Sequence, residues 1–132
     1  MNEVSSLLER HGIRPTQQRV KVAEVLLTAP VHLTAEPLLT TLRQSPSRVS
    51  KATVYNTLKL FIEKGLVREV IVDPSKVFFD PNTSPHHHFY EVDTGKLSDI
   101  DAEHVQISGL PPLPAGMVTE GIDLIVRVRC KT

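Results

Sequence analysis

The first half of the chain places apolar residues three and four positions apart, which is the spacing of amphipathic helices. The spacing predicts a first helix over residues 2–11 and three more that begin after Thr16, Thr34 and Ser50, residues that favour helix starts. Gly65 is expected to end the fourth. The predicted buried faces comprise Val4, Leu7 and Leu8; Val20, Ala23, Leu26 and Leu27; Leu38, Leu39 and Leu42; and Val54, Leu58, Phe61 and Ile62.

The pattern changes after the fourth helix. Residues 66–72 and 76–80 are rich in β-formers, and the turn sequence Asp73-Pro74-Ser75 joins them into a predicted hairpin. Helices followed directly by a two-stranded hairpin are typical of a winged helix. We therefore expect a winged-helix domain over residues 1–80, with residues 81–85 as a hinge.

The second half predicts a smaller β-rich domain over residues 86–132. Residues 89–92 and 97–100 flank the turn sequence Asp93-Thr94-Gly95. Residues 122–129 alternate as in a strand with one buried side, formed by Ile122, Leu124, Val126 and Val128. The proline-rich run 110–114 precludes a long helix. Three strands in about fifty residues make a poor independent core, so we expect a second copy to pair with a strand edge.

Composition and charge narrow the class of protein. With 40% apolar and 23% charged residues the chain is globular, and no segment is expected to cross a membrane or act as a signal peptide. Residues 1–80 carry 11 basic and 8 acidic side chains, and residues 81–132 carry 4 and 7. The basic half suits phosphates and the acidic half suits cations. Cys130 is the only cysteine, which excludes a disulfide framework. We expect a cytoplasmic protein.

The fourth predicted helix, opened by residues 48–58, has a polar face suited to DNA. Lys51, Thr53, Tyr55 and Asn56 would be exposed there, and these residue types recognise base edges and phosphates in a major groove. In a helix-turn-helix the start of the second helix meets the bases. Arg14 and Arg19 lie near the start of the second predicted helix and suit the flanking backbone or the minor groove. The alternative is an ordinary solvated helix face.

The histidine triplet at residues 86–88 lies between Asp80 and Asp99. Imidazole and carboxylate suit Zn, Mn or Fe. On an extended segment His86 and His88 point to one face and His87 to the other. The alternative is an exposed loop whose histidines bind nothing.

Four segments together resemble the ferric uptake regulator family: GIRPTQQR at 12–19, HLTAE at 32–36, ATVYNTL at 52–58 and the histidine triplet. SPHHHFY at 84–90, with PAGM at 114–117 and IDLIVR at 122–127, is similar to the iron response regulators. Peroxide-sensing members also have an aspartate at the position of Asp80. The resemblance covers nearly the whole chain. It implies an α+β fold with an N-terminal winged helix-turn-helix and a small C-terminal α/β dimerisation domain.

By the same resemblance the chain is a homodimeric, metal-dependent repressor that binds double-stranded DNA at an AT-rich palindromic operator. One divalent ion per subunit, Fe²⁺, Mn²⁺ or Zn²⁺, is expected. The implied ligands are His32, Asp80, His86, His88 and Asp99. Tyr55 and Asn56 occupy base-contacting positions, and Arg14 the minor-groove position. A four-cysteine structural zinc site is not expected, because Glu91 and Thr94 stand at its first pair of positions.

A second metal site or a haem site is also a candidate. His87 falls at a carboxylate position of a second site in some relatives, but Pro85 and Gly121 stand where further ligands are usual. His87 with His104, together with Asp101 and Glu103, is an alternative set, and surface polarity explains these residues equally well. Haem at residues 86–88 stays open because iron response regulators can use a histidine-rich segment for haem.

These observations leave three candidate functions for the chain. The first is a metal-activated repressor for iron or manganese homeostasis or peroxide defence. The second is a regulator of the same fold that haem or peroxide inactivates, in the peroxide case by oxidation of His32 or His86. The third is a metallohydrolase, since His/Asp sets activate water, but a five-ligand shell leaves little room for substrate. We therefore expect that the chain is not an enzyme.

Overall fold

The chain consists of two compact units. The computed structural model describes residues 3–30, 32–44 and 49–132. Two positions of the predicted helical segments, Asn2 and Arg48, lie outside the described residues. The first unit is Met1–Thr83 and the second is Ser84–Thr132. The boundary falls within residues 81–85, and the hinge role of this segment stays a prediction.

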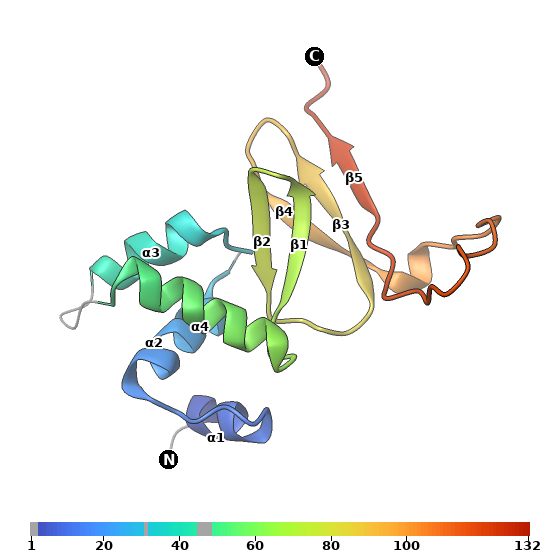
Figure 1. Cartoon of the computed structure of the whole chain (residues 1–132). Coiled ribbons are helices and arrows are strands. Elements are labelled where there is room, and N and C mark those ends of the chain that lie inside the picture. The colour runs from blue at the N-terminus through green and yellow to red at the C-terminus, as the bar shows by residue number, and fades with distance from the viewer. Residues whose placement is uncertain (1–2, 31, 45–48) are drawn as a thin grey trace. The chain divides into compact units, whose positions relative to one another are not determined.

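Unit 1 begins with the four predicted helices, seen in Figure 1 from the N-terminus onward. They are α1 (Glu3–Arg10), α2 (Gln17–Thr28), α3 (Ala35–Arg43) and α4 (Lys51–Glu63). Among the described residues, no helix combines the length and apolar character needed to cross a bilayer.

Two of the three predicted helix caps are confirmed. The Thr16 hydroxyl accepts the Arg19 N–H at 3.2 Å at the start of α2, and the Ser50 hydroxyl accepts the Thr53 N–H at 3.1 Å at the start of α4. Each bond satisfies a helix-end donor that has no partner within the helix. The prediction for Thr34 is wrong in its mechanism, because its side chain makes no capping hydrogen bond with α3.

The main hydrophobic core lies in unit 1 and follows the predicted faces closely. Val54 and Leu58 of α4 are buried, as are Leu38, Leu39 and Leu42 of α3. One prediction is wrong: Leu27 is 37% exposed, because the buried face of α2 is formed by Val22, Ala23 and Leu26.

The hairpin of unit 1 consists of β1 (Arg68–Asp73) and β2 (Lys76–Asp80). Its first strand begins two residues later than predicted. Leu66 donates its N–H to the Phe61 carbonyl at 2.9 Å, which closes the end of α4 before the strand starts. The helices and this hairpin form the predicted winged helix.

A single antiparallel bridge connects the hairpin to the segment before α3. It pairs Leu33 with Phe79, and the Phe79 N–H donates to the Leu33 carbonyl at 2.9 Å. Phe79 is buried in the core, so the bridge has a fixed position. It ties the segment before α3 to the outgoing end of β2.

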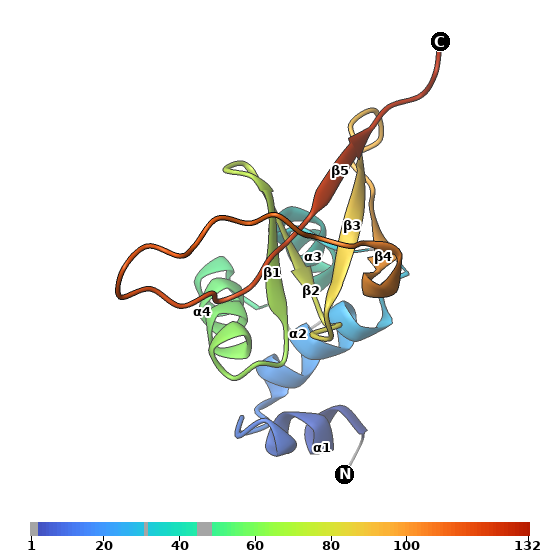
Figure 2. The ribbon, with the colours of Figure 1, turned by 90° about the vertical axis from the view of Figure 1, so that its right-hand side faces the viewer.

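Unit 2 contains a three-stranded sheet in the order β4-β3-β5, and Figure 2 shows β3 between its neighbours. Its elements are β3 (His86–Glu91), β4 (Leu97–Asp101), the short 3₁₀ helix η1 (Ala102–His104) and β5 (Ile125–Val128). β3 is antiparallel to β4 and parallel to β5. β3 starts three residues earlier than predicted, so the histidine triplet is part of the central strand.

The last predicted strand is shorter than expected. Residues 105–124 form no helix or strand, which agrees with the proline-rich run, and β5 covers only Ile125–Val128. Ile122 and Leu124 are 45% and 37% exposed, so the predicted burial of that face is wrong within one copy. Pairing with β3 begins only at Leu124, whose carbonyl accepts the His88 N–H at 3.1 Å.

Candidate metal centre and DNA-binding surface

The Leu33–Phe79 bridge positions the first two candidate ligands. Because antiparallel partners run in opposite directions, the residue before Leu33 lies across from the residue after Phe79. These residues are His32 and Asp80, and their Nδ1 and Oδ1 atoms lie 3.7 Å apart. Asp80 is fully buried, and its Oδ1 accepts the Asn82 N–H at 2.9 Å. Unit 1 therefore holds one imidazole and one oriented carboxylate together.

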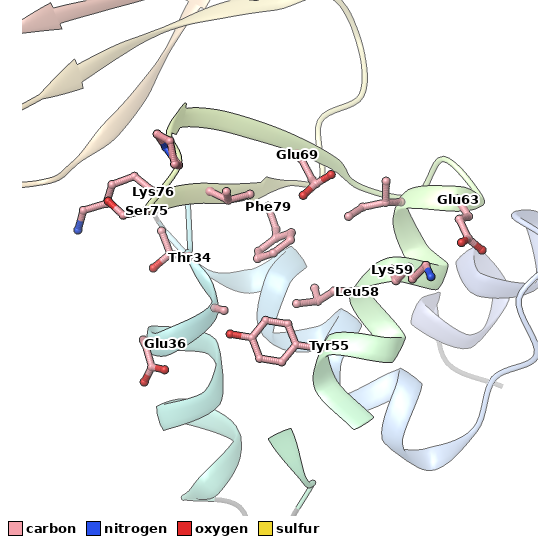
Figure 3. Close-up of a pocket in the computed structure, with 14 residues that line it drawn as sticks. Thr34, Glu36, Tyr55, Leu58, Lys59, Glu63, Glu69, Ser75, Lys76 and Phe79 are labelled. Atoms are coloured by element: carbon pink, nitrogen blue, oxygen red, sulfur yellow. The ribbon is translucent and has the colours of Figure 1, made fainter. Parts of the chain in front are cut away.

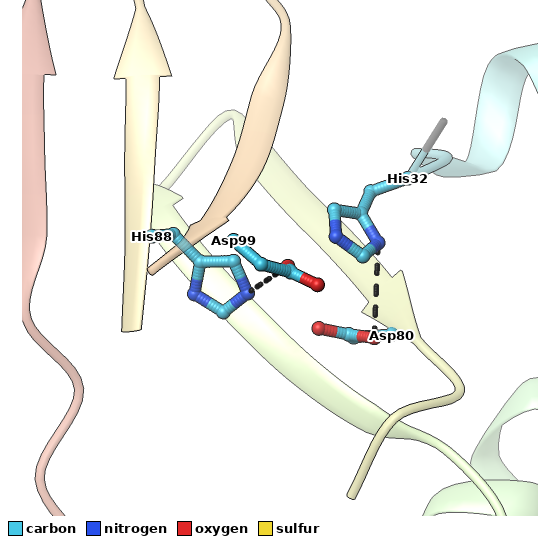
Figure 4. Close-up of side chains that lie close together, drawn as sticks. All are labelled: His32, Asp80, His88 and Asp99. Atoms are coloured by element: carbon cyan, nitrogen blue, oxygen red, sulfur yellow. Dashed lines mark ion pairs between the residues drawn. The ribbon is translucent and has the colours of Figure 1, made fainter. Parts of the chain in front are cut away.

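The register of β3 and β4 gathers three more candidate ligands in unit 2. His88 pairs directly with Asp99, and His86 lies two residues away on the same face of β3. The Nε2 atoms of His86 and His88 each lie 3.5 Å from Asp99 Oδ1. Figure 4 shows the His88–Asp99 pair of unit 2 and, separately, the His32–Asp80 pair of unit 1.

Burial differs sharply within the unit 2 group. The His86 and His88 side chains are 5% and 0% exposed, whereas Asp99 is 43% exposed. Burying imidazoles is costly unless their nitrogens are paired. The arrangement thus presents two buried nitrogen donors with a carboxylate on the accessible side.

The tautomer of His86 follows from its neighbour. Its Nδ1 lies 2.7 Å from the Ser84 carbonyl oxygen, which can only accept, so Nδ1 carries a proton. In the neutral ring Nε2 is then a lone-pair donor facing the Asp99 carboxylate. Such a carbonyl contact to the distal nitrogen is the usual way proteins orient metal-ligating histidines.

The donor spacing fits a divalent ion. Two ligands each about 2.1 Å from a tetrahedral ion lie about 3.4 Å from one another. The nitrogen–oxygen distances of 3.5 Å in unit 2 are close to this value and longer than a charge-assisted hydrogen bond. The residues present therefore suit Zn²⁺, Mn²⁺ or Fe²⁺ chemically.

His87 and His104 are not part of this group. His87 points to the opposite face of β3, where its Nδ1 accepts the Leu124 N–H at 3.0 Å. His104 ends η1 on the surface, and its side chain makes no hydrogen bond or ion pair with any described residue. A second metal site or a haem site at these residues stays a prediction.

Three of the four side chains of α4 that were predicted to be exposed are exposed: Lys51, Tyr55 and Asn56. The prediction for Thr53 is wrong, because its side chain is half-buried beside the Ser50 cap. The Lys51 ammonium lies 5.9 Å from the centre of the Tyr55 ring, a cation–π distance one helical turn apart. The Ser50 hydroxyl also donates to the Thr53 hydroxyl at 2.8 Å, so Thr53 is oriented by the cap.

Tyr55 and Asn56 line different hollows of unit 1. Tyr55 borders a groove of about 750 Å³ between α4, the start of α3 and the hairpin. Figure 3 shows its ring near Leu58 and facing the side chain of Phe79. Asn56 borders a second hollow of about 390 Å³ at the start of α2. The two candidate base-reading residues of α4 thus border different hollows.

The second hollow brings several candidate DNA contacts together. Arg19, Thr53 and Asn56 all line it, with Gln18, which the sequence analysis missed. The polar start of α2 was the available signal for Gln18. Arg19 also donates through Nη1 to the Arg14 carbonyl at 3.0 Å, so the two arginines are neighbours. Hydroxyl, amide and guanidinium groups in one hollow suit a phosphate and an adjacent base.

Comparisons with known proteins agree across the chain. A sequence profile of the ferric uptake regulator family matches residues 10–109. The peroxide operon regulator of Bacillus subtilis (strain 168) is 35% identical over 100 residues, which are 76% of this chain and 69% of that protein. The peroxide-responsive repressor PerR of Staphylococcus aureus (strain Mu50) is 31% identical over 117 residues, 89% of this chain and 78% of that protein.

The fold is shared with solved structures. The ferric uptake regulator from Pseudomonas aeruginosa, solved with manganese, has a TM-score of 0.72 at 27% identity. The match covers 99% of this chain and 100% of that chain. It therefore extends over both the helical unit and the sheet unit.

Proposed function

This chain belongs to the ferric uptake regulator family and is a metal-dependent transcriptional repressor of metal homeostasis or the peroxide response, and we propose that five of its own side chains hold the metal. The proposed ligands are His32, Asp80, His86, His88 and Asp99. The observation that carries the proposal is the convergence of the two buried imidazoles of β3 on one carboxylate oxygen.

The identity of the ion is a narrower proposal. Nitrogen and carboxylate ligands suit Fe²⁺, Mn²⁺ and Zn²⁺, and affinity order alone favours Zn²⁺ over the other two. The similar Pseudomonas aeruginosa regulator was solved with manganese, which supports Mn²⁺ as the ion to test first. One ion per subunit is proposed.

We propose that the ion couples the two units. A bound divalent cation supplies the positive charge that donors of both units share. His32 and Asp80 come from unit 1, and the other three ligands from unit 2. Segment 81–85 would lose freedom as a hinge once donors on both sides of it are held. In a dimer, fixing that hinge fixes the spacing of two recognition helices relative to half-sites.

DNA recognition is proposed for the exposed side of α4 that carries Lys51, Tyr55 and Asn56. Family members are dimeric DNA-binding proteins. Tyr55 and Asn56 are proposed to read base edges, with Lys51, Thr53, Arg14 and Arg19 on phosphates or the minor groove. An AT-rich palindrome of double-stranded DNA is the proposed operator, because a symmetric dimer matches a palindromic site.

The proposed dimer surface lies on unit 2. Nine of the twelve large apolar side chains that are exposed among the described residues belong to this unit, although it is the smaller one. Contiguous exposed apolar patches mark interaction sites, and we propose that these side chains form such a patch. β5 also leaves one edge open, since the sheet order ends with it. A second copy is the proposed partner for both features, without a structural zinc.

The test uses an operator selected by the protein itself from random double-stranded DNA in the presence of Mn²⁺. Gel-shift titrations with and without Mn²⁺ should show at least tenfold tighter binding with the metal. His88→Ala should abolish this difference, and the control His11→Gln, in the turn that follows α1, should retain it. Equal binding by the wild type in both conditions would contradict the metal switch.

Peroxide inactivation is the second candidate, favoured by the two peroxide regulators among the similar proteins. His32 and His86 are the proposed sites of oxidation. Mass spectrometry of Fe²⁺-loaded protein after peroxide should find one added oxygen on a peptide that contains either residue. Mn²⁺-loaded protein is the control. A metallohydrolase stays the least supported alternative, to be tested by turnover of phosphate esters and amides.

A further inference from the structure

His87 stands between two proposed ligands but faces away from them. The alternation of β3 buries His86 and His88 on one side of the sheet and turns His87 to the other. Its side chain is half-buried on the face that also carries Phe89. The strand that holds the proposed metal ligands therefore also presents an imidazole to the opposite face.

Both backbone polar groups of Leu124 are bound by consecutive residues of β3. The Leu124 N–H donates to His87 Nδ1 at 3.0 Å, and the Leu124 carbonyl accepts the His88 N–H at 3.1 Å. Because a backbone N–H only donates, Nδ1 of His87 is unprotonated in this contact. Leu124 is thus attached to the side chain of one histidine and to the backbone of the next.

This attachment lies where the chain returns to the sheet. Residues 105–124 contain no helix or strand, and closing such a loop costs conformational entropy. β5 has only four residues, and parallel pairing is slightly less stable per residue than antiparallel pairing. The register of β5 begins one residue later, with Ile125 opposite His88. The hydrogen bonds to Leu124 therefore decide where β5 starts.

We propose that His87 is a positioning residue that couples the metal site to β5. When a metal holds His86 and His88, the motion of β3 is restricted. His87 transmits that restriction through its hydrogen bond to Leu124 and so to β5, the strand that follows. The inference deepens the proposed function and rests on it. It assigns to His87 a role that is neither metal ligation nor haem ligation.

The experiment is hydrogen exchange of the full-length protein, followed by mass spectrometry of peptides covering residues 122–130, with and without Mn²⁺. In the wild type, Mn²⁺ should slow exchange in these peptides. In His87→Ala, exchange should be roughly fivefold faster without metal, because one hydrogen bond is lost, and the slowing by Mn²⁺ should disappear. His87→Asn should restore both behaviours, because its Oδ1 accepts the same N–H.

Mn²⁺ affinity, measured by calorimetry, separates this proposal from the proposed function. His87→Ala should bind Mn²⁺ within about threefold of the wild type, whereas His88→Ala should lose at least tenfold. If His87→Ala lost as much Mn²⁺ affinity as His88→Ala, His87 would be a metal ligand and the proposal would be overturned. Wild-type exchange rates in His87→Ala would also overturn it.

Two outcomes distinguish a failure of the proposed coupling from a failure of the proposed metal site. If the wild type binds Mn²⁺ and the 122–130 peptides do not respond, the coupling is overturned and the proposed function stands. If the wild type binds no Mn²⁺, the proposed metal site fails and the coupling fails with it. In that case the metal-free comparison of His87→Ala with His87→Asn still decides whether His87 anchors β5.

Discussion

Leu33 pairs with Phe79 in an isolated antiparallel bridge, and this one pair sets His32 opposite Asp80. The bridge joins a residue before α3 to the end of β2. Phe79 is 7% exposed, and its side chain packs in the core of unit 1 while its backbone forms the bridge. Core packing and the placement of the candidate ligands therefore depend on the same residue.

Replacing that side chain should affect stability and metal binding together. Phe79→Ala should lower the free energy of unfolding of unit 1 by about 3–5 kcal/mol, because it leaves a cavity. Below the unfolding transition it should also weaken Mn²⁺ binding. Urea unfolding and calorimetry measure the two effects. Ile71→Ala, on the same hairpin but 60% exposed, is the control and should change neither by much.

Asp99 is the accessible member of the unit 2 group, and its removal tests the site with little risk to folding. Asp99→Asn keeps the shape of the side chain but removes the negative charge facing His86 and His88. We expect at least a tenfold loss of Mn²⁺ affinity by calorimetry and an unchanged unfolding midpoint without metal. Glu120→Gln, in the exposed loop, is the charge-matched control. Equal affinity of both variants would exclude Asp99 as a ligand.

The cap of α4, the proposed recognition helix, is expected to matter for stability and for DNA binding. Ser50→Ala removes the acceptor for the Thr53 N–H and should cost about 1 kcal/mol of unfolding free energy. It should also weaken operator binding, because Thr53 loses its orientation. Thr34→Ala is the matched control at a helix start without a side-chain cap, and should cost clearly less. Similar losses in both would show that the Ser50 cap contributes little.

Replacing a proposed base-reading residue of α4 and a proposed phosphate-binding residue of α2 should weaken DNA binding in different ways. Asn56→Ala should cost about 1–3 kcal/mol in binding to the selected operator and little in binding to scrambled DNA. Arg19→Ala should weaken both about equally and reduce the dependence on salt. Fluorescence anisotropy at several salt concentrations measures both variants. If Asn56→Ala weakened binding to both DNAs equally, Asn56 would be assigned to the DNA backbone instead of to a base.

The stability of the turn between β1 and β2 should fall at low pH. The side chain and the backbone N–H of Ser75 hydrogen-bond to Asp73 and hold the pKa of its carboxyl below the ordinary 3.8. The turn is therefore stabilised above pH 3.8, and this contribution is lost as the pH falls through the lowered pKa. Carbon NMR of the Asp73 carboxyl should show the low value, and Ser75→Ala should raise it. Ser98→Ala is the control. A wild-type value at or above 3.8 would contradict the expectation.

The helical unit was predictable because its signals are local. Apolar spacing and the cap residues Thr16 and Ser50 fix where α2 and α4 begin, and the burial of Val54 and Leu58 follows from the same spacing. The Leu33–Phe79 bridge was not predictable, because it joins residues far apart in the chain through one pair with no repeating pattern. The sequence therefore indicated His32 only through family resemblance, and it indicated Asp80 as a carboxylate near the histidine triplet without showing that His32 lies beside it.

The sheet unit was predicted less well for a different reason. The alternation of side chains along an extended strand correctly predicted that His86 and His88 lie on one face of β3 and His87 on the other. The alternation of residues 122–129 overestimated β5, because a pattern indicates what a strand can bury in an assembly and not what one copy buries. Leu124 shows the difference, since it pairs with β3 through its backbone while its side chain stays 37% exposed.

The long connection at residues 105–124 has a consequence for proteolysis. It carries no helix or strand and exposes Leu110, Met117 and Val118, so it is a substrate for proteases that cleave after apolar residues. A cut there would leave β5 held to the rest of the sheet by its short ladder and by the hydrogen bonds of Leu124 and Cys130. Loss of β5 would reduce the sheet to the β3–β4 hairpin, and an isolated hairpin is marginally stable. The helical unit has its own hydrophobic core and would stay folded, whereas the β3 and β4 residues proposed as metal ligands would lose the support of the third strand.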